Sequence, residues 1–176
     1  MDKELKEFVS ESIANEVLQN FDKLYKSFDV VVVEDYNKGL ISESICKEII
    51  KKCKASQTPI FIDPHLTTPA HFYKDADLLK PNINEVFTLL NISQNSIIDK
   101  KINHFTLAKR LQSELNLKEV LLTLGQDGMA ILADDQLTKI PTLAKQVYDV
   151  TGAGDTVIAV LALAHAVGLT LSLIHI

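Results

Sequence analysis

The chain contains no tryptophan, only two cysteines and no surplus of basic residues. Its 176 residues have a formal net charge of −5, so the basic footprint typical of nucleic-acid-binding proteins is absent. No apolar stretch reaches about 18 residues without polar interruption, and we expect a buried helix over 157–174 rather than a membrane span. The charged first residues lack the apolar core of a signal peptide. These absences argue against nucleic acid and membranes as partners.

Cysteine and histidine are placed in ways that exclude two kinds of site. Cys46 and Cys53 would lie on one face of a helix, two turns apart, which is too far for a disulfide. We expect both to face the core of a protein in the reducing cytoplasm. The five histidines are scattered and show no metal-ligand spacing.

Composition and periodicity predict an α/β domain. With 47% hydrophobic and 23% charged residues, the chain can bury a core and is one domain or a large part of one. The apolar pattern predicts helices over 2–26, 42–54, 84–90, 105–115 and 157–167, and strands over 30–33, 59–62, 76–79, 119–124 and 129–133. This alternation favours an open, mostly parallel sheet with helices on both faces and ligands at the carboxyl ends of the strands.

A glycine turn before the last apolar run is the most informative segment. Residues 149–155 read Asp-Val-Thr-Gly-Ala-Gly-Asp and lead into the helix predicted over 157–167. The glycines allow backbone N–H groups to approach an anion, and the helix start adds partial positive charge. Asp155 can then take a proton from an attacking hydroxyl. The alternative is an ordinary turn with an acidic residue at a helix start.

Two further segments carry polar residues near strand ends. Asn82 and Glu85 are three positions apart at a helix start, where both can face one site, and their oxygens suit a hard cation. A capping box is the alternative. Thr123, Gly125 and Gly128 follow a strand and allow a ligand to approach the backbone closely, unless they form a plain hairpin turn.

The loop after the first predicted strand contains Asp35 and Lys38. Lys38 can meet a substrate phosphate as a point charge. The alternative is a solvated loop with no ligand. A second loop, Asp63-Pro64-His65, follows the next predicted strand.

Four of these segments occur in the order found in one family. Residues 80–85 resemble the Asn-x-x-Glu motif of the ribokinase-type carbohydrate kinases, residues 122–128 their Thr-x-Gly-x-x-Gly segment, and residues 149–155 their Asp-Thr-x-Gly-Ala-Gly-Asp signature. Residues 34–39 and 148–159 are similar to one branch, the D-glycero-β-D-manno-heptose 7-phosphate kinases. Asp63-Pro64-His65 matches the Asp-Pro-Lys of that branch only in part, because His65 replaces a lysine. The resemblance is clearest over 28–168.

The resemblance implies a ribokinase-like three-layer α/β/α sandwich with a mostly parallel central sheet, and it implies ATP and Mg²⁺ as cofactors. It also assigns roles to residues of this chain: Asp155 as general base; Gly152, Ala153 and Gly154 as the anion hole; Thr123, Gly125 and Gly128 on the ribose and base side of the nucleotide; Asn82 and Glu85 beside magnesium and the phosphates; Asp35 and Lys38 at the substrate.

The implied reaction is transfer of the γ-phosphoryl group of MgATP to a sugar hydroxyl. In the heptose branch this converts heptose 7-phosphate to heptose 1,7-bisphosphate for the lipopolysaccharide core. Fructose 1-phosphate, ribose or a nucleoside are alternative acceptors, and a nucleotide-binding fragment without turnover is the alternative from another class. The resemblance also implies a cytoplasmic protein, a homodimer when full length, and a fused or partner nucleotidyltransferase domain.

The resemblance further implies that residues 1–176 are only the C-terminal portion of a kinase domain. We expect the first strands and the lid to be missing at the N-terminal side and the C-terminal side to be shortened. Residues 171–176 do not resemble a natural continuation, and we expect them to be an artefact of sequencing or assembly. Because a truncated parallel sheet exposes an edge, we predict that this chain alone is poorly stable and lacks full activity.

Overall fold

The structure is a computed structural model that describes residues 7–92, 103–142 and 152–169. One sheet holds six strands in chain order: β1 (Val31–Glu34), β2 (Ile60–Asp63), β3 (Leu78–Leu79), β4 (Glu119–Thr123), β5 (Met129–Ala133) and β6 (Gln136–Ile140). The first four strands are parallel, whereas β5 is antiparallel to both β4 and β6. The prediction of a mostly parallel sheet is therefore confirmed.

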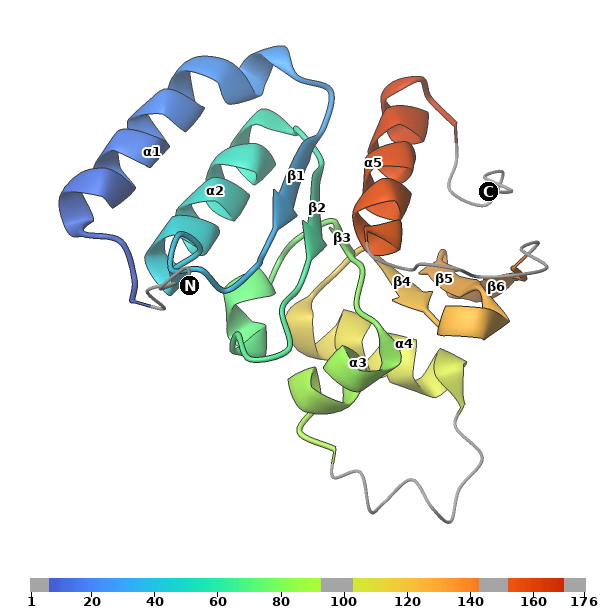
Figure 1. Cartoon of the computed structure of the whole chain (residues 1–176). Helices are drawn as coiled ribbons and strands as arrows, with labels where there is room; N and C mark the ends of the chain where they lie inside the picture. The colour runs from blue at the N-terminus through green and yellow to red at the C-terminus, as the bar shows by residue number, and fades with distance from the viewer. Residues whose placement is uncertain (1–6, 93–102, 143–151, 170–176) are drawn as a thin grey trace.

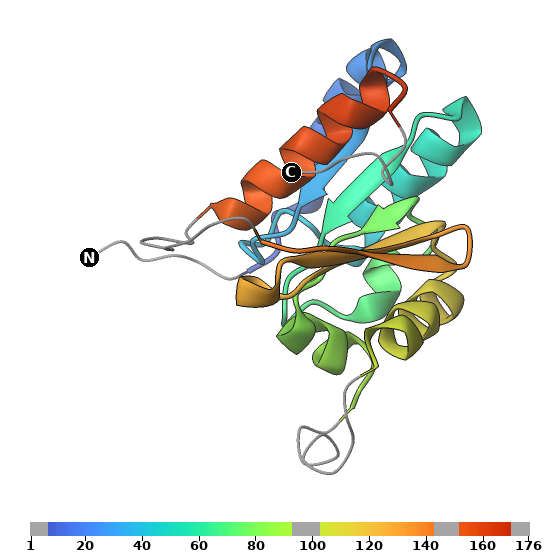
Figure 2. The same cartoon turned by 90° about the vertical axis from the view of Figure 1, so that its right-hand side faces the viewer.

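Helices cover both faces of this sheet, as predicted. They are α1 (Glu11–Leu24), α2 (Glu43–Ser56), α3 (Ile83–Leu89), α4 (His104–Leu115) and α5 (Ala153–Ala166), with short 3-10 turns η1 (Tyr25–Ser27), η2 (Ala70–Tyr73) and η4 (Gly125–Asp127). Crossovers between parallel strands have one hand, so helices that connect strands in chain order fall on one face. Accordingly, α1 to α4 share one side, and α5 lies across β1 and β2 on the other (Figures 1 and 2).

Alternating strand residues divide the core between the two faces, because successive side chains of a strand point to opposite sides. Ile60 and Ile62 pack in the cluster that includes α2, α3 and α4. Phe61, between them, packs with α5 on the opposite face. Strands β2 and β4 are thus buried on both faces, which explains their almost continuous apolar sequence. The smaller cluster combines four strand residues with α5: Phe61, Leu78, Leu121, Ile131, Ile158, Leu161, Ala162 and Ala164.

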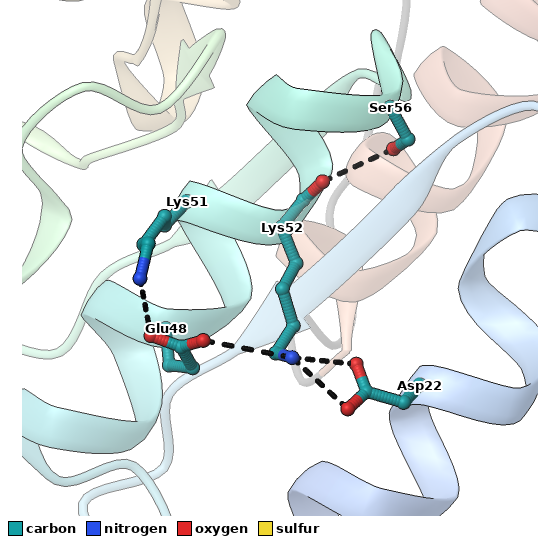
Figure 3. Close-up of polar contacts among 5 residues, drawn as sticks. All are labelled: Asp22, Glu48, Lys51, Lys52 and Ser56. Atoms are coloured by element: carbon teal, nitrogen blue, oxygen red, sulfur yellow. Dashed lines mark hydrogen bonds and ion pairs between the residues drawn. The ribbon is translucent and has the colours of Figure 1, made fainter.

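The first helix is shorter than predicted. Helix α1 begins at Glu11, because the side chain of Ser10 caps it by accepting a hydrogen bond from the Ile13 N–H at 3.4 Å. It packs beside α2, where Lys52 forms an ion pair with Asp22 at 2.7 Å and a longer one with Glu48 at 3.5 Å (Figure 3). No residue of α1 is fully buried, so this helix is an outer layer of the molecule.

Other predicted elements also shift. Strand β3 is reduced to two residues, because Asp77 turns its carboxylate to the Ile60 N–H at 2.9 Å. Strand β6 was not predicted, since its sequence is mostly polar and most of its residues are not buried. Cys46 and Cys53 are free and buried in α2, as expected. Within the described residues, no helix is long and apolar enough to span a membrane. The predictions for 149–151 and 171–176 fall outside the described residues.

Candidate active site

The carboxyl ends of the parallel strands bring the predicted polar residues to one edge of the sheet. Glu34 ends β1 and is the register partner of Asp63, which ends β2. Lys80 follows β3 directly, and two residues later Asn82 forms a parallel bridge with Thr123 at the end of β4. The predicted metal-side and nucleotide-side residues are therefore neighbours at this edge, where ligands of such sheets bind.

The N-terminus of α5 reaches the same edge. Gly152 is the N-cap, with a φ of +78° that favours glycine, and Asp155 lies in the first turn. The Tyr36 hydroxyl lies 2.9 Å from the Asp155 carboxylate and 2.7 Å from that of Glu34. Because these two carboxylates accept hydrogen bonds from the phenol, they raise the pKa of Tyr36 and keep it protonated. Asp155 is thus linked to the loop after β1.

Asp63 and Lys80 form an ion pair next to this helix start. The Asp63 carboxylate and the Lys80 ammonium are 2.7 Å apart, and their side chains are 18% and 4% exposed. Burial raises the pKa of Asp63, and the charges of Glu34 and Asp155 add to this, while Lys80 opposes it. The cluster therefore concentrates negative charge around one buried cation.

Asn82 and Glu85 form the capping box that was the structural alternative for this pair. The Asn82 side chain accepts from the Glu85 N–H at 3.0 Å, and the Glu85 carboxylate accepts from the Asn82 N–H at 2.7 Å. Burial raises the pKa of Glu85, and the nearby charge of Asp63 raises it further. A carboxylate whose ionisation is disfavoured in this way is suited to a cation beside it or to a water bound to that cation.

These oxygen donors could supply only part of the coordination shell of a magnesium ion. Among the residues that the structure describes, no group of three or more acidic, histidine or cysteine side chains could enclose a metal ion. Mg²⁺ usually takes one or two carboxylates and completes its shell with water and substrate phosphates. Glu85 and Asp63 are such carboxylates, so the site fits a metal that arrives with a nucleotide.

The two glycines after β4 differ in how much space surrounds them. Both have positive φ, +60° at Gly125 and +85° at Gly128. A Cβ atom on Gly128 would lie 2.2 Å from the carbonyl oxygen of Ile140, so the hairpin itself demands glycine there. A Cβ atom on Gly125 would meet nothing within 4 Å. The hairpin explanation therefore accounts for Gly128, whereas Gly125 leaves backbone open to a ligand.

The predicted substrate residues, Asp35 and Lys38, do not take part in the contacts described above. Asp35 is 6% exposed and accepts hydrogen bonds from the hydroxyls of Thr68 and Tyr73, both at 2.7 Å. Its carboxylate thus holds the loop after β1 from inside, and its role toward a substrate stays a prediction. Lys38 is exposed on the same loop, and its predicted role at a phosphate also remains a prediction.

The sequence did not predict that four residues of this edge interact: Glu34, Tyr36, Asp63 and Lys80. A signal was present, since Lys80 is a charged residue directly after a buried apolar pair and Asp63 ends another buried strand. Charged residues at such positions are rarely buried without a partner. The contact between Tyr36 and Asp155 gave no sequence signal, because the two are 119 positions apart.

Comparison with known proteins is consistent with this geometry. The model of the pfkB family carbohydrate kinases matches residues 6–173. The bifunctional protein HldE of Nitratiruptor sp. is 35% identical over 168 residues, which are 96% of this chain and 34% of that protein. HldE of Campylobacter curvus is 38% identical over 150 residues, 85% of this chain and 31% of that protein. The chain thus spans about a third of the length of these relatives.

Solved structures show the same fold over a larger fraction of their length. Phosphofructokinase-2 from Escherichia coli in complex with potassium superposes with a TM-score of 0.77 at 14% identity, covering 93% of this chain and 52% of the other. Ribokinase from Arabidopsis thaliana with ribose and ATP gives a TM-score of 0.65 at 23% identity, covering 93% and 49%. The fold is ribokinase-like, and the predicted resemblance is confirmed. The chain belongs to the pfkB family of carbohydrate kinases.

Proposed function

We propose that this chain is the C-terminal portion of a kinase domain that transfers the γ-phosphoryl group of MgATP to a hydroxyl of a sugar phosphate. The observation that carries this proposal is the placement of Asp155. Its carboxylate lies in the first turn of α5, at the strand ends that also hold Asp63, Glu85 and Thr123. A base beside a helix N-terminus is what attack by a hydroxyl on a phosphate requires.

The residues of the edge then have separate tasks. Asp155 takes the proton of the attacking hydroxyl, and the N–H groups of Gly152 to Gly154 stabilise the charge that develops on the transferred phosphoryl group. Bound Mg²⁺ would neutralise charge on the phosphates, with Asn82 and Glu85 on its side of the site. The open backbone at Gly125 receives the nucleotide beyond β4.

Heptose 7-phosphate is the acceptor that we propose. Residues 34–39 and 148–159 resemble the heptose 7-phosphate kinases, and the HldE relatives are 35% and 38% identical over most of this chain. These relatives are bifunctional proteins, which supports a fused second domain in the longer protein. Fructose 1-phosphate, ribose and a nucleoside remain the alternative acceptors, and a panel of these with an ATP-consumption assay separates them.

The decisive experiment replaces Asp155 by Asn in the chain extended by the N-terminal part of the kinase domain that we propose to precede it. We expect the rate of phosphoryl transfer to heptose 7-phosphate, measured as ADP release, to fall by at least ~10²-fold. This is the usual contribution of a general base. Asp22→Asn, a surface carboxylate of α1, is the matched control and should leave the rate unchanged. MgADP binding that is unchanged by Asp155→Asn and is accompanied by no turnover would favour the nucleotide-binding alternative. Turnover that is indifferent to Asp155→Asn would show that Asp155 is not the base.

A further inference from the structure

A pocket of about 340 Å³ between α2 and residues 71–75 is lined mainly by cationic side chains. Its cationic lining residues are Lys47, Lys51, Lys54, His71 and Lys74. The roles proposed for the candidate active site involve none of them. The whole chain has a net charge of −5, so this concentration of positive charge opposes the overall balance. Such a concentration favours an anion as ligand.

Three of these lysines follow one face of α2. Lys47, Lys51 and Lys54 are spaced four and three positions apart, so their side chains leave the helix on the same side. Lys52 leaves on another side and turns to Asp22 of α1 (Figure 3). Like charges four positions apart repel each other and destabilise a helix. The lysine face is therefore unfavourable for α2 alone.

The carboxylates beside α2 are shared between cations. Glu43 lies 2.5 Å from the ammonium of Lys47 and 3.3 Å from the ring of His71. Glu48 lies 3.5 Å from Lys51, and it lies at the same distance from the lysine that turns to α1. Each of these two carboxylates thus has two cationic partners, and neither fully compensates the charge of one.

The third carboxylate, Asp75, lines the pocket and is shared in the same way. It lies 3.2 Å from the ammonium of Lys54. Its pKa is lowered first by the hydrogen bond from Asn116 and then by the charges of Lys54 and Lys74. The pocket and its rim therefore combine four lysines and a histidine with three carboxylates, which leaves a surplus of positive charge. An anion would supply the missing partner.

The lining also indicates which anion fits. Lysine binds phosphate as a point charge, whereas the planar fork with which arginine holds a carboxylate is absent from the described lining residues. Lys47 and Lys54 are about 10 Å apart along the helix, at 1.5 Å per residue, so one phosphate group cannot reach both ends of the row. The volume is at the low end of the range of about 300–1,000 Å³ for ligand pockets. Ile50 alone among the described lining residues is apolar, which disfavours a nucleobase.

We propose that this pocket binds a small ligand with two separated phosphate groups, of the chemical class of the sugar bisphosphates. The lysine row of α2 binds the phosphate groups along its length, and Lys74 adds a contact from the segment after η2. This site is separate from the proposed nucleotide site and does not depend on it.

The experiment titrates fructose 1,6-bisphosphate into the 176-residue chain at constant ionic strength, with calorimetry and amide NMR shifts as readouts. We expect shifts at 47–54 and 71–75 and none at 152–155. Lys47→Gln with Lys54→Gln should weaken binding at least ~10-fold, because two charge-assisted contacts are lost. Both side chains are about half exposed, so this variant should fold. Lys23→Gln with Lys26→Gln, outside the pocket, is the matched control and should leave the affinity unchanged.

Two further anions test the spacing of the phosphate groups. Orthophosphate carries one group and pyrophosphate two adjacent ones, so each should bind at least ~10-fold more weakly than fructose 1,6-bisphosphate. Equal affinity for orthophosphate would indicate an adventitious ion only, and equal affinity for pyrophosphate would overturn the separated groups.

Three results would overturn the site itself. They are no binding of the bisphosphate, binding that the Lys47→Gln and Lys54→Gln pair leaves unchanged, and amide shifts confined to 152–155. A polyglutamate peptide that shifts the amides of 47–54 when the bisphosphate does not would make this face a docking surface for an acidic protein, and the inference would be wrong. The Asp155→Asn experiment tests the proposed function separately, whichever of these results is obtained.

Discussion

Two lysine–aspartate pairs in this molecule have similar contact lengths, but the pKa of the aspartate shifts in opposite directions. Lys80 and Asp63 are 2.7 Å apart at the sheet edge, and Lys54 and Asp75 are 3.2 Å apart on the outer side of α2. The first pair is 4% and 18% exposed and the second 44% and 38%. Burial raises the pKa of Asp63 despite its lysine, whereas Asn116 and then Lys54 lower the pKa of Asp75.

The difference shows that desolvation, rather than the length of the contact, decides whether the pKa of the paired aspartate is raised or lowered. Lys54 and Asp75 are exposed and stay hydrated, so Asp75 keeps its charge with only a weak attraction from Lys54. At the edge, Lys80 has to compensate for lost hydration and for the neighbouring charges of Glu34 and Asp155.

The largest effect should come from breaking the buried pair. We expect Lys80→Met to lower the free energy of unfolding by about 3–5 kcal/mol, because Asp63 is left as a buried charge without a partner. Urea denaturation at neutral pH measures this. The double variant with Asp63→Asn should recover most of the loss. A loss below about 1 kcal/mol for Lys80→Met would contradict this prediction, because the buried pair would then contribute no more than an exposed one.

The pH dependence should differ in sign between the pairs. The folded-state pKa of Asp63 is raised, so its stabilising protonated form is fully present below the unfolded value of about 4 and is lost as pH rises through the raised value. The pKa of Asp75 is lowered, so its contribution is present above about 4 and is lost as pH falls through the lowered value.

Urea denaturation from about pH 3 to about pH 7 tests both signs. Relative to the wild type, the neutral variant with Lys80→Met and Asp63→Asn should gain stability as pH rises. Asp75→Asn should lose stability over the same range, with a difference of up to about 1 kcal/mol at neutral pH. Asn also suits this position because Asp75 has a φ of +74°. Parallel curves for both variants would contradict the comparison.

The smallest effect should come from the exposed pair. Lys54→Met should cost about 0.2–1 kcal/mol, because both partners remain hydrated when the contact is lost. The cost should vanish near 1 M salt, where screening extends over only about 3 Å. Thermal unfolding at low and high salt measures this. A loss that persists in salt would show that packing of the lysine stem, rather than charge, carries the contact.

Much of the fold could be predicted because it depends on local pattern. The apolar runs of β1, β2 and β4 and the Ser42 cap of α2 need only neighbouring residues to be recognised. Strand β6 escaped prediction because its residues are mostly polar. The capping box at Asn82 was predicted as an alternative, and its geometry is present, while the metal role of the same residues stays a prediction.

The site was predictable only as separate motifs. The contact between Tyr36 and Asp155, and the ion pair of Asp63 and Lys80, depend on which strands are neighbours and on where α5 crosses them. Such contacts arise from register and packing, which single-sequence patterns do not encode. Burial of Asp35 was hidden for the same reason, since its partners Thr68 and Tyr73 lie more than thirty positions away.

The order of the strands has a consequence for how the molecule is made. Each strand pairs with the one synthesised before it, so a chain leaving the ribosome can extend the sheet one strand at a time. Helix α5 is the exception, because it returns over β1 and β2 after all six strands have been made. We therefore expect the nascent chain to hold this sheet edge before it holds Asp155, so that the proton acceptor that we propose is synthesised after the other residues of the candidate site.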